Sequence, residues 1–126
     1  MTATSGAADG VVNGAALDAA ACLFRGFSDP SRIAILRHLR LGERRVTDLT
    51  AHLGLAQSTV SKHLFCLRDC GLVDSRPHGR ASVYSLKHPE ALDELFAAAE
   101  KLLDLTGRAV TLCANYGSST VSGQSS

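Results

Sequence analysis

The chain has 126 residues, the size of one domain or of one subunit in a larger assembly, which excludes a two-domain enzyme. Hydrophobic residues make up 45% of it and charged residues 20%, so the composition excludes both a wholly disordered chain and a fibrous protein. The formal net charge of +1 by itself predicts no attraction to nucleic acid or to a membrane surface.

The charges are distributed unevenly along the chain. Residues 25–87 contain eleven lysines and arginines and only five acidic residues, whereas the segments before and after them are acidic. A basic middle within a near-neutral chain is typical of a nucleic-acid-binding module attached to a scaffold that does not bind. A solvated surface of mixed charge is consistent with the same pattern, so the motifs must decide between the two.

Both ends of the sequence resemble tails. Residues 1–13 are mostly small or polar, and residues 114–126 are polar and rich in glycine and serine. We expect two flexible tails around a folded DNA-binding and dimerisation domain of residues 14–113. The sequence shows neither a long apolar run nor the pattern of a signal peptide. We therefore expect a cytoplasmic protein without membrane contact, in a compartment where thiols stay reduced.

Four helices are expected in the first half of the domain. The first covers residues 15–26, where apolar residues recur at helical spacing. The second begins with a capping pair before Pro30 and ends at Gly42. The third covers residues 46–53, and the fourth begins near Gln57.

The period of the sequence changes after Gly71. Residues 72–76 and 81–86 have strand-like composition, and Pro77–Arg80 between them predicts the turn of a β-hairpin. Pro89 then opens a long helix whose apolar stripe extends to about residue 112. The predicted order is α-α-α-α-β-β-α, a mainly α fold with a β-hairpin that matches the winged helix-turn-helix arrangement.

The predicted fourth helix has three faces when its residues are placed at about 100° intervals. The core face consists of Val60, Leu64 and Leu67. The face that we assign to DNA consists of Ser58, Ser61, Lys62 and Phe65, with Gln57 near its edge. The third face consists of Thr59, His63, Cys66 and Cys70. The two thiols therefore lie one helical turn apart and point away from the residues that would read DNA.

Several short motifs between residues 29 and 86 occur together in one known family. They are DPSRIAIL at 29–36, VTDL at 46–49, QSTVSKHL at 57–64, Leu67-Arg68, Gly71-Leu72-Val73, Gly79-Arg80 and VYSL at 83–86. With them the chain resembles the ArsR/SmtB family of bacterial metal-responsive repressors over most of its folded part. The resemblance implies a homodimer with the first and last helices at the interface, DNA bound without metal, and release when metal binds.

The segment LFCLRDCGL at residues 64–72 looks like the thiol-bearing helix of the cadmium- and lead-sensing members of this family. Those members pair two such cysteines with a third in the C-terminal region, which implies the ligand set Cys66, Cys70 and Cys113. The residue types agree, because soft cations such as Cd(II) and Pb(II) prefer thiolate ligands and cysteines four apart on a helix can share one ion. No histidine follows residue 88, so the Asp/His site of the zinc-, nickel- and cobalt-sensing members looks absent.

Cys22 offers an alternative ligand set. It could complete a three-thiol site with Cys66 and Cys70. Some arsenic-sensing members of the family combine a first-helix cysteine with others, so the resemblance leaves arsenite or antimonite, As(III) or Sb(III), open as the effector. Cys22 lies among apolar neighbours on the first helix, which favours core filler over a metal ligand.

DNA contacts are expected at the start of the fourth helix and on the hairpin, from Gln57, Ser58, Thr59, Ser61, Lys62, His63, Arg76, His78 and Arg80. Thr59 and His63 lie off the centre of the DNA face and are the weaker members. Gln57 is expected to read a base edge, whereas the serines, Lys62 and the arginines should contact phosphate. A two-fold dimer should read a palindromic operator.

Two other functions remain open on the sequence alone. The same cysteines could form a disulfide and make a redox switch. The protein could also bind DNA constitutively, with its cysteines buried and inert. An enzyme is not expected, because no nucleophile–base pair, phosphate loop or carboxylate pair appears in the sequence.

Overall fold

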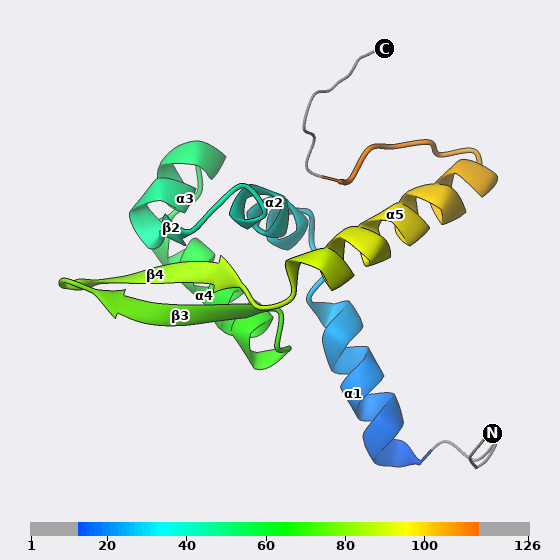
Figure 1. Cartoon of the computed structure of the whole chain (residues 1–126), viewed down its shortest axis with the longest axis horizontal. Coiled ribbons are helices and arrows are strands. Elements are labelled where there is room, and N and C mark those ends of the chain that lie inside the picture. Colours follow the sequence, from blue (N-terminus) through cyan, green and yellow to red (C-terminus); the bar gives the residue numbers. More distant parts are fainter. Residues whose placement is uncertain (1–12, 114–126) are drawn as a thin grey trace.

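A computed structural model describes residues 13–113 and confirms a mainly helical fold with an antiparallel hairpin (Figure 1). Its elements in chain order are α1 (Gly14–Arg25), α2 (Pro30–Leu39), β2 (Arg44–Arg45), α3 (Val46–Leu53), α4 (Gln57–Asp69), β3 (Val73–His78), β4 (Ala81–Leu86) and α5 (Pro89–Leu105). The tails expected at 1–13 and 114–126 lie outside the described residues, except for Asn13. None of the helices in the described part is both long and apolar enough to cross a membrane.

The starts of the first two helices are fixed by side-chain caps. The Asn13 side chain accepts a hydrogen bond from the Ala16 amide at 2.8 Å. The Asp29 carboxylate accepts from the Ser31 and Arg32 amides, and Pro30 occupies the first helical position, where no amide hydrogen is needed. The predicted helix starts are therefore confirmed within one or two residues.

The hydrophobic core lies between α2, α3 and α4 and extends to the sheet and the first half of α5. The predicted core face of α4 is confirmed, because Val60, Leu64 and Leu67 are all 0% exposed. The other buried members of this cluster are Ile35, Leu36, Leu39, Leu49, Val73, Leu92 and Phe96. Packing of this face against α2, α3 and β3 fixes α4 in place and leaves its opposite face at the surface.

The sheet has three strands rather than the two expected. Its order is β2-β4-β3, with both pairs antiparallel and Arg44 opposite Tyr84. Two arginines give no periodic signal, which is why the sequence did not indicate β2. The predicted turn at Pro77–Arg80 is too long, since Pro77 lies within β3 opposite Ser82 and only Gly79 and Arg80 separate the strands. Proline is tolerated there because β3 is an edge strand.

The last helix is shorter than predicted. It ends at Leu105 rather than near residue 112, because Gly107 adopts a left-handed backbone with φ of 82°. The Gly107 amide donates to the Asp104 carbonyl at 3.0 Å and the Arg108 amide to the Leu103 carbonyl at 2.8 Å, which satisfies the carbonyls at the helix end. The apolar residues beyond Gly107 mimic a continued helical stripe. They instead form a segment that runs back along α5 (Figure 1).

α1 and α5 project from the body of the molecule (Figure 1). α1 has no fully buried residue, and Leu17 and Phe24 on it are 59% and 58% exposed. At its end Gly26 is buried, and a Cβ there would meet the Leu72 side chain at 2.7 Å. The absent side chain thus allows the end of α1 to lie directly against Leu72, just beyond α4.

Candidate nucleic-acid interface and thiol site

α4 presents a polar face to solvent opposite its buried face. Four of the residues predicted to contact DNA lie exposed on this face, namely Gln57, Ser58, Ser61 and Lys62. Phe65, one turn after Ser61, is 73% exposed on the same face. Phe65 is an additional candidate for DNA contact, because an exposed aromatic ring on such a face can meet a thymine methyl group.

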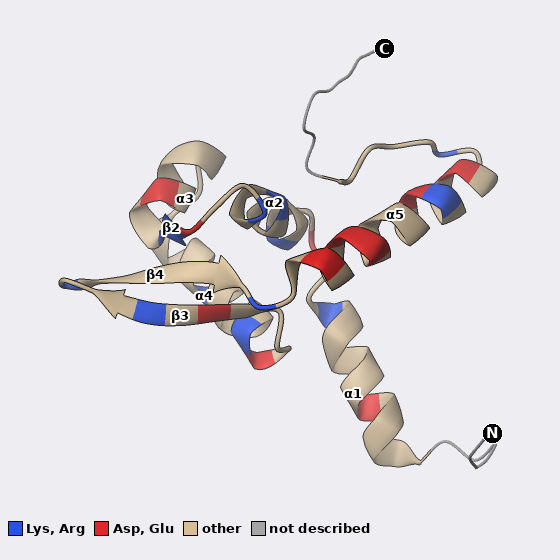
Figure 2. Ribbon diagram, viewed as in Figure 1, with Lys and Arg blue, Asp and Glu red and all other residues tan. Residues whose placement is uncertain are grey.

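Basic residues lie on α2, α4 and the hairpin, whereas the first turns of α5 are acidic (Figure 2). His78 ends β3 and Arg80 lies in the hairpin turn, and both are exposed. Arg76 differs from them, because its guanidinium is paired with the Glu43 carboxylate at 2.7 Å. This hydrogen-bonded pair lowers the pKa of the Glu43 carboxyl, so the two charges already neutralise each other at neutral pH.

His63 and Thr59 are half-buried, in keeping with their placement off the centre of the DNA face. The Nδ1 of His63 lies 3.2 Å from Nη1 of Arg32, and its Nε2 lies 3.8 Å from the Asp29 carboxylate. Arg32 is a contact that the sequence pattern did not reveal. Its Nη2 also donates to the Arg25 carbonyl and to the Ser28 hydroxyl, both at 2.9 Å. Arg32 therefore joins the end of α1 to the middle of α4.

The structure brings Cys22 and Cys70 together. Their Sγ atoms are 3.3 Å apart, and the Cys70 thiol also donates to the Cys22 carbonyl at 2.6 Å. Cys22 lies on α1 and Cys70 caps the end of α4, and both are half-buried. The Arg25 guanidinium lies 3.9 Å from the Cys22 sulfur and places a positive charge beside it. The predicted orientation of the thiol face of α4 thus directs Cys70 toward α1.

The Cys70 thiol is strongly biased toward its protonated form. Burial raises its pKa, and the neighbouring Cys22 and Cys66 raise it further, to about 12. Cys66 is therefore close enough to Cys70 to interact with it electrostatically. A bound cation would reverse this bias, because it stabilises the thiolate that ligates it.

Cys113 lies elsewhere in the subunit, on the segment that runs back along α5. The Glu100 carboxylate accepts hydrogen bonds from the Leu112 amide at 2.5 Å and the Cys113 amide at 2.7 Å. Burial and the Glu100 charge raise the pKa of the Cys113 thiol. The Cys113 sulfur also lies 3.9 Å from the Asp93 carbonyl oxygen. The structure thus does not bring Cys113 to Cys66 and Cys70 within this subunit.

Within residues 13–113, no three histidine, cysteine or acidic side chains are arranged so that they could hold one metal ion. The Cys22–Cys70 pair, with Cys66 beside it, is the closest arrangement of thiols that the structure describes. A thiophilic atom could contact two sulfurs there without a change of backbone. A third thiolate would require a movement of Cys66, a rearrangement of the segment that carries Cys113, or a cysteine of another chain.

The chain is similar to bacterial regulators. The sequence pattern of the family described as "Bacterial regulatory protein, arsR family" matches residues 29–75. A relative named "Probable mercury resistance operon repressor", from Streptomyces lividans, is 38% identical over 81 residues, which cover 64% of this chain and 65% of that protein. The regulator CmtR of Mycobacterium tuberculosis is 48% identical over 68 residues, covering 54% of this chain and 58% of CmtR.

The regulator NmtR of the same species is 42% identical over 85 residues, covering 65% of this chain and 71% of NmtR. A solved homodimeric winged helix-turn-helix DNA-binding domain from Mycobacterium bovis has a TM-score of 0.64 and 30% identity, covering 73% of this chain and 84% of that one. The matched part spans about three-fifths of the length of the CmtR and mercury-operon relatives. The solved domain agrees with the winged helix-turn-helix fold described above.

Proposed function

Because the chain belongs to the ArsR family of bacterial regulatory proteins, we propose that it is a dimeric transcriptional repressor that leaves its operator when a thiophilic ion binds its cysteines. It is not an enzyme, since the family and the matched relatives are DNA-binding regulators. The proposal that a thiophilic ion is the effector rests on the 3.3 Å contact between the sulfurs of Cys22 and Cys70, which joins α1 to the end of α4.

The DNA-binding half rests on α4 and the hairpin. The exposed face of α4 would enter the major groove, with Gln57 at a base edge and Lys62 at a phosphate. The hairpin tip would lie along the backbone through His78 and Arg80. Arg76 would contribute less, because the Glu43 carboxylate already neutralises its charge.

The dimer rests on apolar surface that one subunit leaves uncovered. Leu17 and Phe24 on α1, and Leu102 and Leu105 on α5, are between 58% and 74% exposed. Exposed apolar side chains on two projecting helices favour association with a second copy. Replacing Leu105 with glutamate should convert the dimer to monomer in analytical ultracentrifugation. A dimer that persists after replacement of both Leu17 and Leu105 would exclude this interface.

The effector site would use Cys22 and Cys70, joined by Cys66. These thiols lie behind the DNA face, so an ion can bind there without covering the residues that read DNA. An ion bonded to Cys22 and Cys70 would cross-link the end of α1 to the end of α4. Recruitment of Cys66 as a further ligand would move the end of α4 and change the angle at which the two recognition helices of the dimer meet the operator. The ligand set of Cys66, Cys70 and Cys113 that the family resemblance implies requires a rearrangement of the C-terminal segment, or the partner subunit's Cys113.

The relatives named for mercury and arsenical resistance support a soft effector in general. Cd(II) and Pb(II) favour thiolates, and As(III) and Sb(III) form up to three bonds to sulfur, so each is a candidate. The Cys22–Cys70 contact favours the ligand set of Cys22, Cys66 and Cys70. The family resemblance associates this set with arsenite or antimonite as the effector.

The test is a titration of the reduced full-length dimer on a palindromic DNA selected from a random pool. Cd(II), Pb(II), As(III), Zn(II) and Ni(II) are added in turn, and the series is repeated with serine at positions 22, 66, 70 and 113. We expect at least one thiophilic ion to lower operator affinity about tenfold or more, as allosteric coupling typically does. Serine at 22 or 70 should abolish this response, while serine at 113 should preserve it.

Retention of the full response by the Cys70→Ser variant would contradict the effector site but leave the DNA-binding half intact. A response lost in Cys113→Ser and kept in Cys22→Ser would instead establish the ligand set of Cys66, Cys70 and Cys113. Failure to select any DNA would contradict repression itself.

The same 3.3 Å contact favours a redox switch as the second candidate. Hydrogen peroxide would oxidise the two thiols to a disulfide, with one hydrogen peroxide molecule reduced to two waters. The high pKa of Cys70 acts against this route, because the thiolate is the species that attacks an oxidant. Release that needs oxidant and is insensitive to chelators would identify the redox switch.

A further inference from the structure

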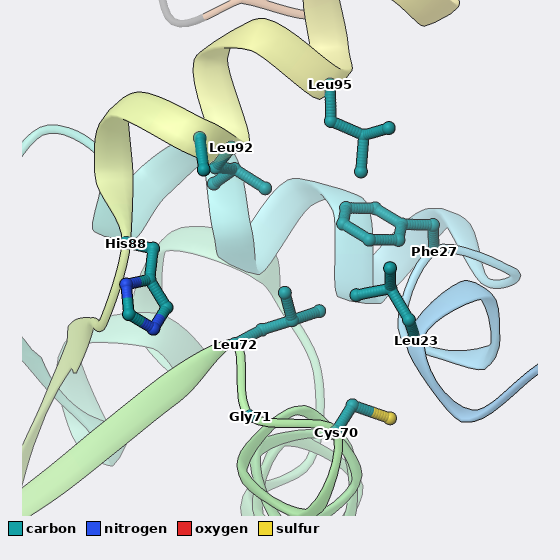
Figure 3. A pocket seen from close by; sticks show the side chains of 9 residues that line it. Leu23, Phe27, Cys70, Gly71, Leu72, His88, Leu92 and Leu95 are labelled. Carbon is teal, nitrogen blue, oxygen red and sulfur yellow. The ribbon is translucent and has the colours of Figure 1, made fainter. Parts of the chain in front are cut away.

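An apolar cavity of about 360 Å³ has Cys70 among its lining residues. It is partly open to solvent and is bordered by the end of α1, the residues that follow α4 and the start of α5 (Figure 3). Leucine and phenylalanine side chains from all three elements line it, namely Leu23, Phe27, Leu72, Leu92 and Leu95. An apolar cavity of roughly 150 Å³ is enough to bind benzene, so this one has room for an aromatic group.

Two polar side chains border this cavity, Cys70 and His88. In Figure 3 the Cys70 sulfur lies at the edge of the cavity below Leu23, on the side of α1, while His88 lies across from it. The Cys22 sulfur is 3.3 Å beyond. A ligand atom bonded to both sulfurs would therefore sit at the cavity edge, with its remaining substituent next to apolar side chains.

The number of thiols in contact points to one chemical class. Trivalent arsenic forms three bonds, and inorganic arsenite fills all of them with exchangeable oxygens that thiols can replace. A singly substituted organic arsenic(III) compound keeps one carbon bond and has two exchangeable positions. The sulfurs of Cys22 and Cys70 are in contact, and an apolar cavity adjoins Cys70. Two sulfurs beside an apolar cavity match the second kind of compound more closely than the first.

We infer that the Cys22–Cys70 pair and the adjoining cavity form a binding site for singly substituted organic compounds of trivalent arsenic. The hydrated compound, R–As(OH)₂, reacts with two thiols, so that two As–S bonds form, two As–O bonds break and two water molecules leave. The oxidation state of arsenic does not change, and each thiol proton leaves within a water molecule. This inference rests on the proposed effector role of the thiols and narrows its ligand.

The organic group would lie against Leu23, Phe27 and Leu72. Removing an aromatic ring from water is favourable by an amount that corresponds to tenfold or more in affinity. Cys66 would not be needed, because both exchangeable positions are already taken by Cys22 and Cys70. The two kinds of arsenic compound should therefore depend differently on this third thiol.

The test compares phenylarsine oxide with arsenite on the full-length reduced protein, using dithiothreitol as a competing dithiol without a cavity. We expect the protein to prefer the phenyl compound over arsenite about tenfold more strongly than dithiothreitol does. The Cys66→Ser variant should keep its affinity for phenylarsine oxide and lose affinity for arsenite. Cys70→Ser should lose both.

A cavity-filling variant gives an independent check. Ala91 lines the cavity on the first turn of α5 and is exposed, so Ala91→Leu should fold normally and occupy the space. Ala97→Leu, also exposed on α5 but outside the cavity lining, is the matched control. Ala91→Leu should lower affinity for phenylarsine oxide about tenfold and leave arsenite binding unchanged, whereas Ala97→Leu should change neither.

The proposal of an organic arsenic ligand would be overturned if the protein preferred phenylarsine oxide over arsenite no more strongly than dithiothreitol does. It would also be overturned if Ala91→Leu left this preference intact. Inorganic ions that still release the operator in that case would leave the proposed function standing. Loss of binding for every thiophilic compound would instead contradict the proposed effector role itself.

Discussion

The Cys70 thiol carries a proton that an incoming ion must displace. It donates that proton to the Cys22 carbonyl at 2.6 Å, and burial together with the neighbouring thiols raises its pKa to about 12. Cys70 is therefore protonated throughout the physiological pH range. A thiolate ligand can form there only as the metal–sulfur bond replaces the sulfur–hydrogen bond.

This proton makes ion affinity depend on pH. Since Cys70 stays protonated below its raised pKa, each Cd(II) ion bound at the site should release the Cys70 proton at every pH from 6 to 8. That release alone should raise the apparent Cd(II) affinity about tenfold per pH unit. Competition with a chelator of known affinity measures the slope. The Cys70→Ser variant should have a slope smaller by about one, and identical slopes in the two proteins would exclude Cys70 as a ligand.

Lys62 and Arg76 should differ in their contribution to DNA binding. Lys62 is exposed on the DNA face of α4, whereas Arg76 is paired with Glu43. Lys62→Ala should therefore lower the slope of log affinity against log salt concentration by about one. Arg76→Ala should lower it less, because the contact with phosphate competes with the Glu43 pair. An unchanged slope in Lys62→Ala would remove Lys62 from the interface.

Residue roles could be predicted from the sequence where helical geometry alone decides them. The periodicity of α4 placed Val60 and Leu64 in the core and turned Cys70 away from the DNA face, and the structure agrees. Contacts between distant segments could not be predicted. Nothing in the pattern indicates that Arg32 meets His63, or that Glu100 holds the amide of Cys113.

At the level of elements, α1 is attached to α4 at two points. Cys22 meets Cys70 at the end of α4, and Arg32 links the last carbonyl of α1 to His63 in the middle of α4. Two separate attachments restrict rotation of α4 about its axis as well as its tilt. A change at the thiols can therefore reach the DNA face as a movement of the whole helix.

Arg32 should stabilise the folded protein by linking the end of α1 to α4. Its guanidinium bonds the Arg25 carbonyl, the Ser28 hydroxyl and the His63 ring, so Arg32→Ala leaves three polar groups without that partner. We expect a loss of about 2 kcal/mol in the free energy of unfolding, measured by urea denaturation. Arg68→Ala, at an exposed position of α4, is the control and should have little effect. Equal stability of the two variants would contradict the linking role.

The limits of the elements could be predicted where capping residues mark them. Asp29 and Pro30 mark the start of α2, and the structure confirms it. The predicted end of α5 near residue 112 was wrong, because the apolar residues after Gly107 continue the hydrophobic pattern while the backbone reverses. β2 was missed because a two-residue strand exists only through its pairing with β4.

At the level of the whole molecule, the thiol pair lies at the junction of the two functional surfaces. α1 and α5 carry the exposed apolar residues that favour dimerisation, while α4 and the hairpin carry the polar and basic residues suited to DNA (Figure 2). The Cys22–Cys70 contact connects the first surface to the second. An ion held between these helices would therefore couple the dimer geometry to operator binding.

Coupling of this kind must act in both directions. If an ion lowers operator affinity, the operator must lower ion affinity by the same factor. The most direct measurement is the dissociation constant of one thiophilic ion for the free dimer and for the dimer on its selected operator, in the wild type and in Cys22→Ser. We predict that DNA weakens ion binding in the wild type by about tenfold or more, equal to the factor by which the ion weakens DNA binding. Equal ion affinity with and without DNA would contradict the coupling of the thiol pair to DNA recognition.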